Sequence, residues 1–164
     1  MLSEQARAEI RAAIEKYPVR RSAILPSLHV AQHEAGYLRP DDMAEIATML
    51  EMSEADVYAV ASFYTMLQRE PTGTYLVEVC TCLACALRGS DLIVDHISQR
   101  LGITEGETTQ DGMFTHRPTA ECLASCGTAP MMMINHQFYE NLTPESVNEI
   151  LERLRSQAGN GHAH

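Results

Sequence analysis

The sequence contains no apolar run that approaches the roughly 18 residues of a membrane span. Its start, MLSEQARAEIRAAIEKYPVRR, also lacks the apolar core and cleavage site of a secretory signal. These absences argue against direct membrane insertion and predict a cytoplasmic protein. Because the cytosol keeps thiols reduced, the five cysteines are expected to bind a metal or to carry redox chemistry rather than to form structural disulfides.

Positive charge is also scarce. The chain has 12 lysines and arginines against 22 aspartates and glutamates, so its formal net charge is −10 at pH 7. Proteins that bind nucleic acid or an anionic membrane surface need a basic patch that neutralises phosphates. No such patch is found in this sequence, so we expect no nucleic-acid partner, and other proteins are the expected partners.

Two common kinds of functional site have no support. The sequence has no Gly-x-Gly-x-x-Gly after a strand and no Gly-Lys-Ser/Thr loop, which are the frequent phosphate-binding patterns. Its carboxylates form no recognisable acid–base pair for hydrolysis. The chain is therefore not expected to bind NADH alone, and its chemistry is sought at the cysteines.

Residues 1–70 are predicted to form a domain of four helices, because apolar residues recur there at helical spacing. The third helix is expected over residues 39–50. Phe63, Tyr64 and Met66 are assigned to the core of this domain in preference to a partner surface. The expected caps and stops of the helices are Ser3, Pro18, Ser22, Gly36, Ser53 and Asp56.

The pattern changes after Pro71 and Gly73, which form a natural domain boundary. The remainder predicts the order β-α-β-β-β-α, with a helix from about Leu87 to Leu101 and a tight turn at Asn135 and His136 between the last two strands. The expected fold class is α+β. The expected domains are an N-terminal helical bundle over 1–70, a mixed domain over 71–157 and a flexible tail over 158–164.

The cysteines form two groups along the chain. Cys80, Cys82 and Cys85 follow the first predicted strand, and Cys122 and Cys126 lie in the segment AECLASCGTAP. Loops at one end of a sheet can face each other, so four sulfurs can meet at one site. Four thiolates suit either an iron-sulfur cluster or a tetrahedral zinc ion.

Spacing alone leaves three alternatives open. Cys82 and Cys85 give a zinc-ribbon-like Cys-x2-Cys, whereas Cys80 and Cys85 give the wider Cys-x4-Cys that a binuclear cluster can use. Cys82-Leu-Ala-Cys85 between a strand and a helix also resembles a thioredoxin-type dithiol. The second group counts against a plain dithiol enzyme, because such an enzyme requires no partner Cys-x3-Cys loop.

Six segments resemble the small iron-sulfur component, known by the letter E, of bacterial NADH:quinone oxidoreductase, the respiratory complex I. This is a family of thioredoxin-like 2Fe-2S ferredoxins, and the resemblance extends from about residue 20 to residue 154. The same family supplies diaphorase subunits of soluble NAD-linked hydrogenases and formate dehydrogenases. The segments are RRSAILPSLHVAQHEAGYL, VYAVASFYTML, VCTCLACALRG, GETTQDGMFT, ECLASCGTAPMMMIN and YENLTPESVNEIL.

The resemblance implies that Cys80, Cys85, Cys122 and Cys126 hold one 2Fe-2S cluster in a thioredoxin-like domain. Cys82 departs from the family pattern and is expected to be a bystander. The implied role is electron transfer within the NADH dehydrogenase module. FMN and NADH are then bound by a partner flavoprotein, and the chain joins the other hydrophilic-arm subunits on the cytoplasmic side of the inner membrane.

Two further expectations concern the surroundings of the cluster. Arg88 is expected either to bring a positive charge near the cluster or to be a solvated helix residue. The bond before Pro130 is expected to be trans, the common state of an X-Pro bond, although thioredoxin-like folds often carry a cis-proline at this place.

Overall fold

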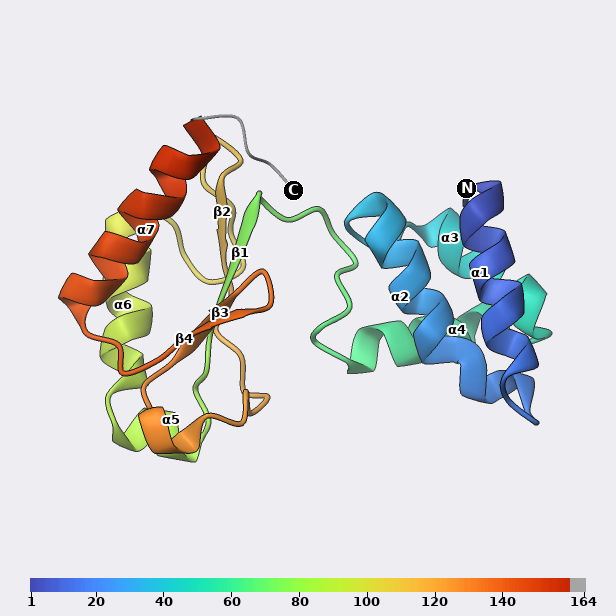
Figure 1. Ribbon diagram of the computed structural model, residues 1–164, viewed down its shortest axis with the longest axis horizontal. Coiled ribbons are helices and arrows are strands. Elements are labelled where there is room, and N and C mark those ends of the chain that lie inside the picture. The colour runs from blue at the N-terminus through green and yellow to red at the C-terminus, as the bar shows by residue number, and fades with distance from the viewer. Residues whose placement is uncertain (160–164) are drawn as a thin grey trace. The chain divides into compact units, whose positions relative to one another are not determined.

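Figure 1 shows the computed structural model, in which residues 1–159 are described. The chain divides into two compact units, Met1–Pro71 and Thr72–His164. The first consists of helices and the second combines helices with a four-stranded sheet. The predicted α+β fold class is confirmed. No helix within residues 1–159 is long and apolar enough to cross a membrane.

The helical unit contains four α-helices and one short 3-10 turn. Its first helix is capped by Ser3, whose Oγ accepts from the Ala6 N–H at 3.1 Å. Ser53 caps the fourth helix in the same way, because its Oγ accepts from the Asp56 N–H at 3.2 Å. The elements are α1 (Glu4–Glu15), a 3-10 turn (Arg20–Ala23), α2 (Ile24–Ala35), α3 (Pro40–Leu50) and α4 (Glu54–Phe63).

The start of α2 differs from the prediction. Ser22 lies inside the 3-10 turn and does not cap the helix, whose N-cap is Ala23. The 3-10 turn leads directly into α2, so the chain needs no side-chain cap at this point. Gly36 does end the helix as predicted, with a left-handed φ of 79°.

The core of the helical unit is made by the inner faces of its helices, with α1 against α2 and α3 against α4. Ile10, Leu28 and Ile46 are fully buried there. The expected burial of Phe63 and Met66 is wrong, because these side chains are 74% and 46% exposed. Helix α4 ends at Phe63 and the chain becomes extended at Tyr64, so the helical spacing no longer points inward. Only Tyr64 packs against the core.

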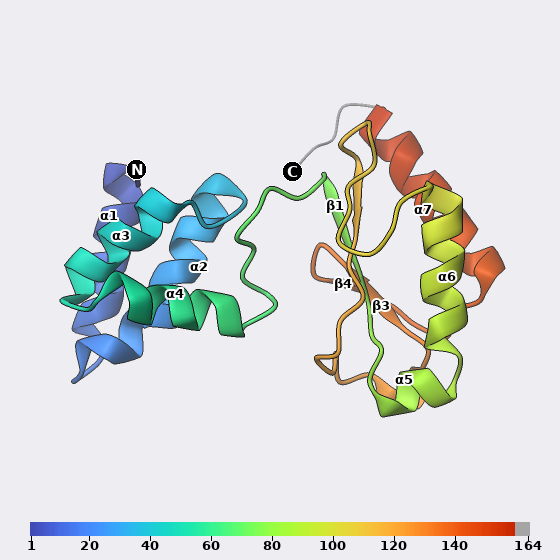
Figure 2. The ribbon, with the colours of Figure 1, turned by 180° about the vertical axis from the view of Figure 1, so that it is seen from behind.

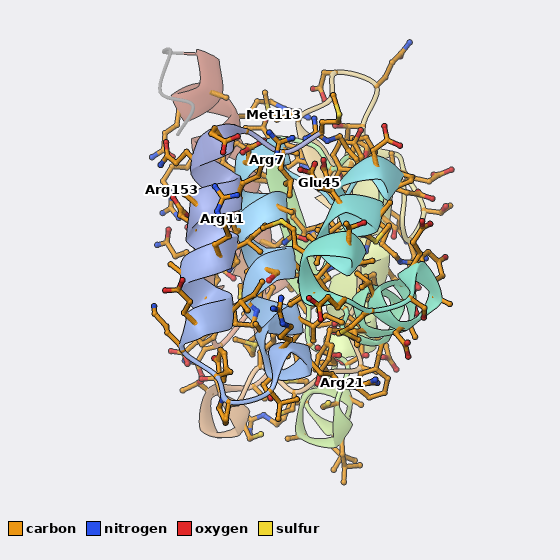
Figure 3. All side chains as sticks on the ribbon, turned by 90° about the vertical axis from the view of Figure 1, so that its right-hand side faces the viewer. Arg7, Arg11, Arg21, Glu45, Met113 and Arg153 are labelled. Atoms are coloured by element: carbon orange, nitrogen blue, oxygen red, sulfur yellow. The ribbon has the colours of Figure 1, made fainter. Side chains whose placement is uncertain are left out.

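An ion pair links the first and third helices of this unit. Arg7 on α1 donates to the carboxylate of Glu45 on α3, and Figure 3 shows the two side chains next to each other. Glu45 also accepts a hydrogen bond from the backbone N–H of Leu2. These bonds lower the pKa of Glu45, with the Arg7 hydrogen bond as the largest cause. They fix the start of α1 against α3.

The second unit has a mixed sheet with the strand order β2-β1-β3-β4. Strand β1 is parallel to β2 and antiparallel to β3, and β3 and β4 form a hairpin through Asn135 and His136. Both turn residues have positive φ, as the type I′ turn of a two-residue hairpin requires. The elements are β1 (Tyr75–Val79), α5 (Leu83–Leu87), α6 (Ser90–Leu101), β2 (Phe114–His116), a 3-10 turn (Cys126–Thr128), β3 (Met132–Ile134), β4 (Gln137–Tyr139) and α7 (Pro144–Gly159).

Helices α6 and α7 lie on the same side of this sheet, as the opposite views of Figure 1 and Figure 2 show. Val77, Val79 and Phe114 face these helices and are fully buried. The side chain of Glu78 points to the other face, because alternate residues of a strand face opposite ways. Glu78 is buried there and forms an ion pair with Arg117, the residue directly after β2.

Two boundaries in this unit differ from the prediction. The helix expected from about Leu87 to Leu101 begins at Ser90 as α6, and the short helix α5 before it was not predicted. Gly89, with a left-handed φ of 88°, lies between the two helices. Helix α7 extends to Gly159, so the first two residues of the predicted tail are helical. Residues 160–164 lie outside the described part of the chain.

Candidate iron-sulfur site

The strand order brings the two cysteine loops to one end of the sheet. Strand β1 runs directly into Cys80, and the parallel strand β2 leaves the sheet at the same end, toward Cys122. Strand β3 runs in the opposite direction, so the segment that enters it from Cys126 also starts at this end. Helix α5, which carries Cys85, lies here too (Figure 1).

The first loop is fixed by the sheet. The backbone N–H of Cys80 donates to the Met131 carbonyl at 3.1 Å, and the N–H of Thr81 donates to the Thr119 carbonyl at 2.9 Å. Cys80 and Cys85 are both buried and pack with Ala129 and Met131. Two of the predicted ligands are therefore held rigidly beneath the surface.

The second loop is more exposed. The sulfurs of Cys122 and Cys126 lie 3.7 Å apart, and both residues are exposed. Ala124 between them has a positive φ of 63°, and its N–H donates to the Cys122 sulfur at 3.4 Å. The backbone therefore folds back and presents both sulfurs on one side of the loop.

Groups of both loops act on the thiol of Cys80. The backbone N–H groups of Leu123, in the second loop, and of Cys82, in the first, favour the charged form of the Cys80 thiol. Burial is the largest influence on Cys80 and raises its pKa, but these N–H groups and the thiols of Cys85 and Cys82 together outweigh it. The pKa of Cys80 therefore lies below its ordinary value.

The thiols of Cys85 and Cys126 have raised pKa values. Burial, followed by the hydrogen bond with Cys80, raises the pKa of Cys85 to about 11. A hydrogen bond with Cys122 raises the pKa of Cys126, and the nearby charge of Cys80 adds to the rise. Like-charged thiolates in one place oppose each other, and a cationic metal centre removes this repulsion.

Cys82 lies among these thiols but has a different environment. Its sulfur donates to the Ala120 carbonyl at 2.7 Å. Burial raises its pKa, and the neighbouring thiols of Cys80 and Cys122 add to the rise. The carbonyl contact stabilises the protonated thiol, whereas a metal ligand must be a thiolate.

The geometry fits a centre in which each metal ion takes two thiolates. Two sulfurs bound at about 2.3 Å to one tetrahedral metal ion lie about 3.8 Å apart, close to the 3.7 Å between Cys122 and Cys126. Within residues 1–159, no three His, Cys, Asp or Glu side chains are arranged around one mononuclear metal position. The 3.7 Å separation therefore suits two thiolates on one tetrahedral metal ion, an arrangement that both an iron-sulfur cluster and a four-cysteine zinc site use.

One contact near the cysteines was not predicted, and two expectations about their surroundings can be compared with the structure. The backbone N–H of Met131 acts on the Cys85 thiol and favours its charged form. The Ala129–Pro130 bond is cis, so the expectation of a trans bond is wrong. Arg88 is exposed and follows the last residue of α5, in agreement with its interpretation as a solvated residue. The Met131 contact depends on the pairing of β1 with β3, which local sequence patterns do not encode.

A further unanticipated feature holds the second loop. The carboxylate of Glu140, just after β4, accepts hydrogen bonds from the hydroxyls of Ser125 and Thr128. Ser125 directly precedes the 3-10 turn that starts at Cys126, and Thr128 is the last residue of that turn. Glu140 lies 14 positions after Cys126 in the sequence, so spacing along the chain gives no sign of this contact.

The cysteine site lies within a segment that matches a known protein family. The profile of the thioredoxin-like [2Fe-2S] ferredoxin family matches residues 10–155. This range includes all five cysteines and most of both structural units.

Curated relatives are similar over most of this chain. The E subunit of NADH-quinone oxidoreductase from Mycobacterium tuberculosis (strain ATCC 25618 / H37Rv) is 48% identical over 153 residues, which are 92% of this chain and 60% of that protein. The corresponding E subunit from Rickettsia bellii (strain RML369-C) is 44% identical over 146 residues, which are 87% of this chain and 87% of that protein. The chain thus spans 60% of the length of the mycobacterial relative.

Solved structures show the same fold. An NAD+-reducing [NiFe]-hydrogenase in the air-oxidized state matches with a TM-score of 0.69 at 22% identity, over 82% of this chain and 23% of that chain. The H2-reduced state of such a hydrogenase gives a TM-score of 0.65 at 25% identity, over 80% of this chain and 22% of that chain.

Proposed function

Because this chain belongs to the thioredoxin-like [2Fe-2S] ferredoxin family, we propose that it is the electron-transferring E subunit of an NADH-quinone oxidoreductase. The resemblance found in the sequence is confirmed by the family match and by relatives that carry this name at 44–48% identity. The observation that carries the proposal is the meeting of two cysteine pairs at one end of the sheet.

The proposed ligands are Cys80 and Cys85 on one iron and Cys122 and Cys126 on the other. The bound 2Fe-2S cluster supplies one-electron chemistry, since it gains or loses a single electron. The 3.7 Å between the sulfurs of Cys122 and Cys126 supports this pairing. Cys82 is left out, because its thiol donates to a backbone carbonyl.

The backbone around the cysteines adjusts the charge of the site. The N–H of Ala124 donates to the Cys122 sulfur, and the backbone N–H groups of Leu123, Cys82 and Met131 favour the thiolate forms of Cys80 and Cys85. Donors that point at ligand sulfurs stabilise negative charge and raise the reduction potential of an iron-sulfur centre. The chain as a whole is acidic, which acts in the opposite direction.

The partner in this proposal is a flavoprotein that holds FMN and binds NADH. This chain then exchanges electrons with that FMN, and its complex lies on the cytoplasmic side of the inner membrane. The sequence of this chain has no phosphate-binding loop of the common types, which is consistent with a nucleotide site in another subunit.

A second candidate is the diaphorase subunit of an NAD-linked hydrogenase or formate dehydrogenase. The structural likeness to an NAD+-reducing [NiFe]-hydrogenase supports it. The sequence identity to that protein is only 22–25%, whereas identity to the quinone-reductase subunits is 44–48%, which favours the first candidate. Affinity purification from the native membrane and cytosol tests the two. Co-purification of quinone-reducing membrane subunits supports the first, and hydrogenase or formate dehydrogenase subunits support the second.

A dithiol enzyme is disfavoured by the structure. The nucleophile of a thioredoxin-type pair needs a lowered pKa and free access. Here burial raises the pKa values of both Cys82 and Cys85, and Cys85 is buried. Reduction of insulin by the colourless, iron-free protein would support the dithiol alternative.

The direct test is analysis of iron and acid-labile sulfide in the anaerobically purified protein, with EPR of the dithionite-reduced form. We expect about two irons and about two sulfides per chain, and a signal of about one spin near a g value of about 2. One zinc and no iron would favour a zinc-stabilised binding module and contradict the proposal.

A further inference from the structure

The turn that carries Cys126 is tied to the end of β4 by one carboxylate. The hydroxyl of Thr128 donates to Glu140 Oε1 at 2.6 Å, and the hydroxyl of Ser125 donates to the same oxygen. The two hydroxyls are 2.8 Å apart. Glu140 thus closes both ends of the short 3-10 turn from Cys126 to Thr128.

Backbone bonds bring Glu140 to this position. The N–H of Asn141 donates to the Thr128 carbonyl at 2.8 Å, and the N–H of Leu142 donates to the Pro130 carbonyl at 2.9 Å. The segment after β4 therefore runs beside the segment that connects the turn to β3. Glu140 is delivered by the hairpin of β3 and β4 rather than by the cysteine loop itself.

The carboxylate is ionised at neutral pH. Hydrogen bonds from Ser125 and then Thr128 lower the pKa of Glu140. Among residues 1–159 no ion pair of Glu140 with a basic side chain is observed. Glu140 is exposed, so water shares its charge with the two hydroxyls, although charge-assisted bonds are stronger than neutral ones.

The two cysteine loops differ in how they are held. The first is bonded to the sheet through Cys80 and Thr81 and is buried at Cys85. The second is exposed at both cysteines, and its 3-10 turn has no side-chain N-cap bond; its own bonds are local, from the Thr128 N–H and hydroxyl to the Ser125 carbonyl, both at 3.2 Å. The second loop therefore depends more on an anchor from outside the loop.

We propose that Glu140 is a positioning residue for the cluster, which holds the Cys126 turn so that Cys122 and Cys126 stay paired as ligands. This inference rests on the proposed function. The negative charge of Glu140, one hydrogen bond away from the residue next to Cys126, also opposes the charge that reduction adds, and so lowers the reduction potential.

The test compares Glu140→Ala and Glu140→Gln with Glu149→Ala in the full chain, each reconstituted anaerobically with iron and sulfide. Glu149 is an exposed residue of α7 and is the matched control. The measurements are the rate of iron loss to a chelator and an EPR-monitored redox titration. We expect about tenfold faster loss in Glu140→Ala, a smaller increase in Glu140→Gln, and the wild-type rate in Glu149→Ala.

The redox titration separates positioning from general stability. Glu140→Gln keeps an oxygen acceptor but removes the charge, so its midpoint potential rises above that of the wild type. A double variant, Ser125→Ala with Thr128→Val, is expected to release iron as Glu140→Ala does, and the triple variant no faster, because all three residues act through one set of bonds.

The failure of this inference differs from the failure of the proposed function. If the wild-type protein holds a normal cluster, and Glu140→Ala loses iron at the wild-type rate and has the wild-type midpoint potential, only the role of Glu140 is overturned. Should Glu140→Ala not fold, as judged by circular dichroism, the same measurements on Glu140→Gln decide. A wild-type chain without iron, or an unchanged EPR signal in Cys126→Ser, overturns the ligand assignment instead.

Discussion

At the scale of single residues, the cysteines of the first loop differ in what each sulfur contacts. Cys85 is buried and packs with Met131, whereas Cys82 donates to the Ala120 carbonyl. We predict that Cys82→Ser keeps the iron content and EPR signal of the wild type, because a serine hydroxyl can also donate to that carbonyl. Cys85→Ser is expected to lose more than about half of the iron, since one thiolate ligand is missing.

Iron analysis and EPR spin counts on both variants, prepared in parallel, check this prediction. Loss of the signal in Cys82→Ser, with retention in Cys85→Ser, would show that the ligand set uses Cys82. An iron content below that of the wild type in both variants would show that the thiol of Cys82 contributes to cluster binding.

Residue identities and spacing were enough to predict the cysteines of the candidate site, but not the contacts around them. The Cys-x4-Cys and Cys-x3-Cys pairs and their resemblance to a known family single out Cys80, Cys85, Cys122 and Cys126. The contact of Cys82 with Ala120 and that of Glu140 with Ser125 join residues far apart in sequence. Such contacts are set by strand pairing, which local periodicity does not report.

At the scale of elements, the break between α5 and α6 separates a short helix at the cysteine site from a long helix of the core. Gly89 forms this break with a φ of 88°. A Cβ introduced at position 89 would meet only Leu92 Cδ1, at 3.7 Å, which is an ordinary contact. The strain of a substitution at Gly89 therefore comes from the backbone conformation alone. We predict that Gly89→Ala lowers the free energy of unfolding by about 1 to 2 kcal/mol.

Urea unfolding followed by circular dichroism measures this change. Gln99→Ala, at an exposed position within α6, is the control and is expected to change stability by less than about 0.5 kcal/mol. Equal stability of the two variants would mean that the left-handed conformation at Gly89 is not required.

Helix ends show where prediction from sequence works and where it stops. The serine caps of α1 and α4 and the glycine stop of α2 were predictable, because each acts through bonds within a few residues. The break at Gly89 was missed, since apolar spacing continues across it. The exposure of Phe63 and Met66 was missed for a related reason, because spacing does not show where α4 ends.

At the scale of the whole molecule, each unit has a core of its own. The buried cluster around Ile10, Leu28 and Ile46 belongs to residues 1–71, and the clusters around Val77 and Cys80 belong to the second unit. All five cysteines lie in the second unit. We predict that a fragment of residues 72–164 binds the same amount of iron per chain as the full chain, with the same EPR signal.

Anaerobic reconstitution of the fragment and of the full chain side by side tests this prediction. An iron-free fragment beside an iron-loaded full chain would show that the helical unit is needed for cluster assembly. A fragment that binds iron but has altered g values would show that the helical unit contacts the environment of the cluster.

The meeting of the two cysteine loops has a consequence for the lifetime of the protein. A cofactor held by both loops ties residue 85 to residue 122 and acts as a cross-link, which restricts the unfolded chain much as a disulfide does. The holo form is then favoured over the unfolded form by mass action. On the proposed ligand set, we expect bound iron and sulfide to protect the chain from proteolysis, so that a shortage of either lowers the amount of polypeptide as well as of its redox centre.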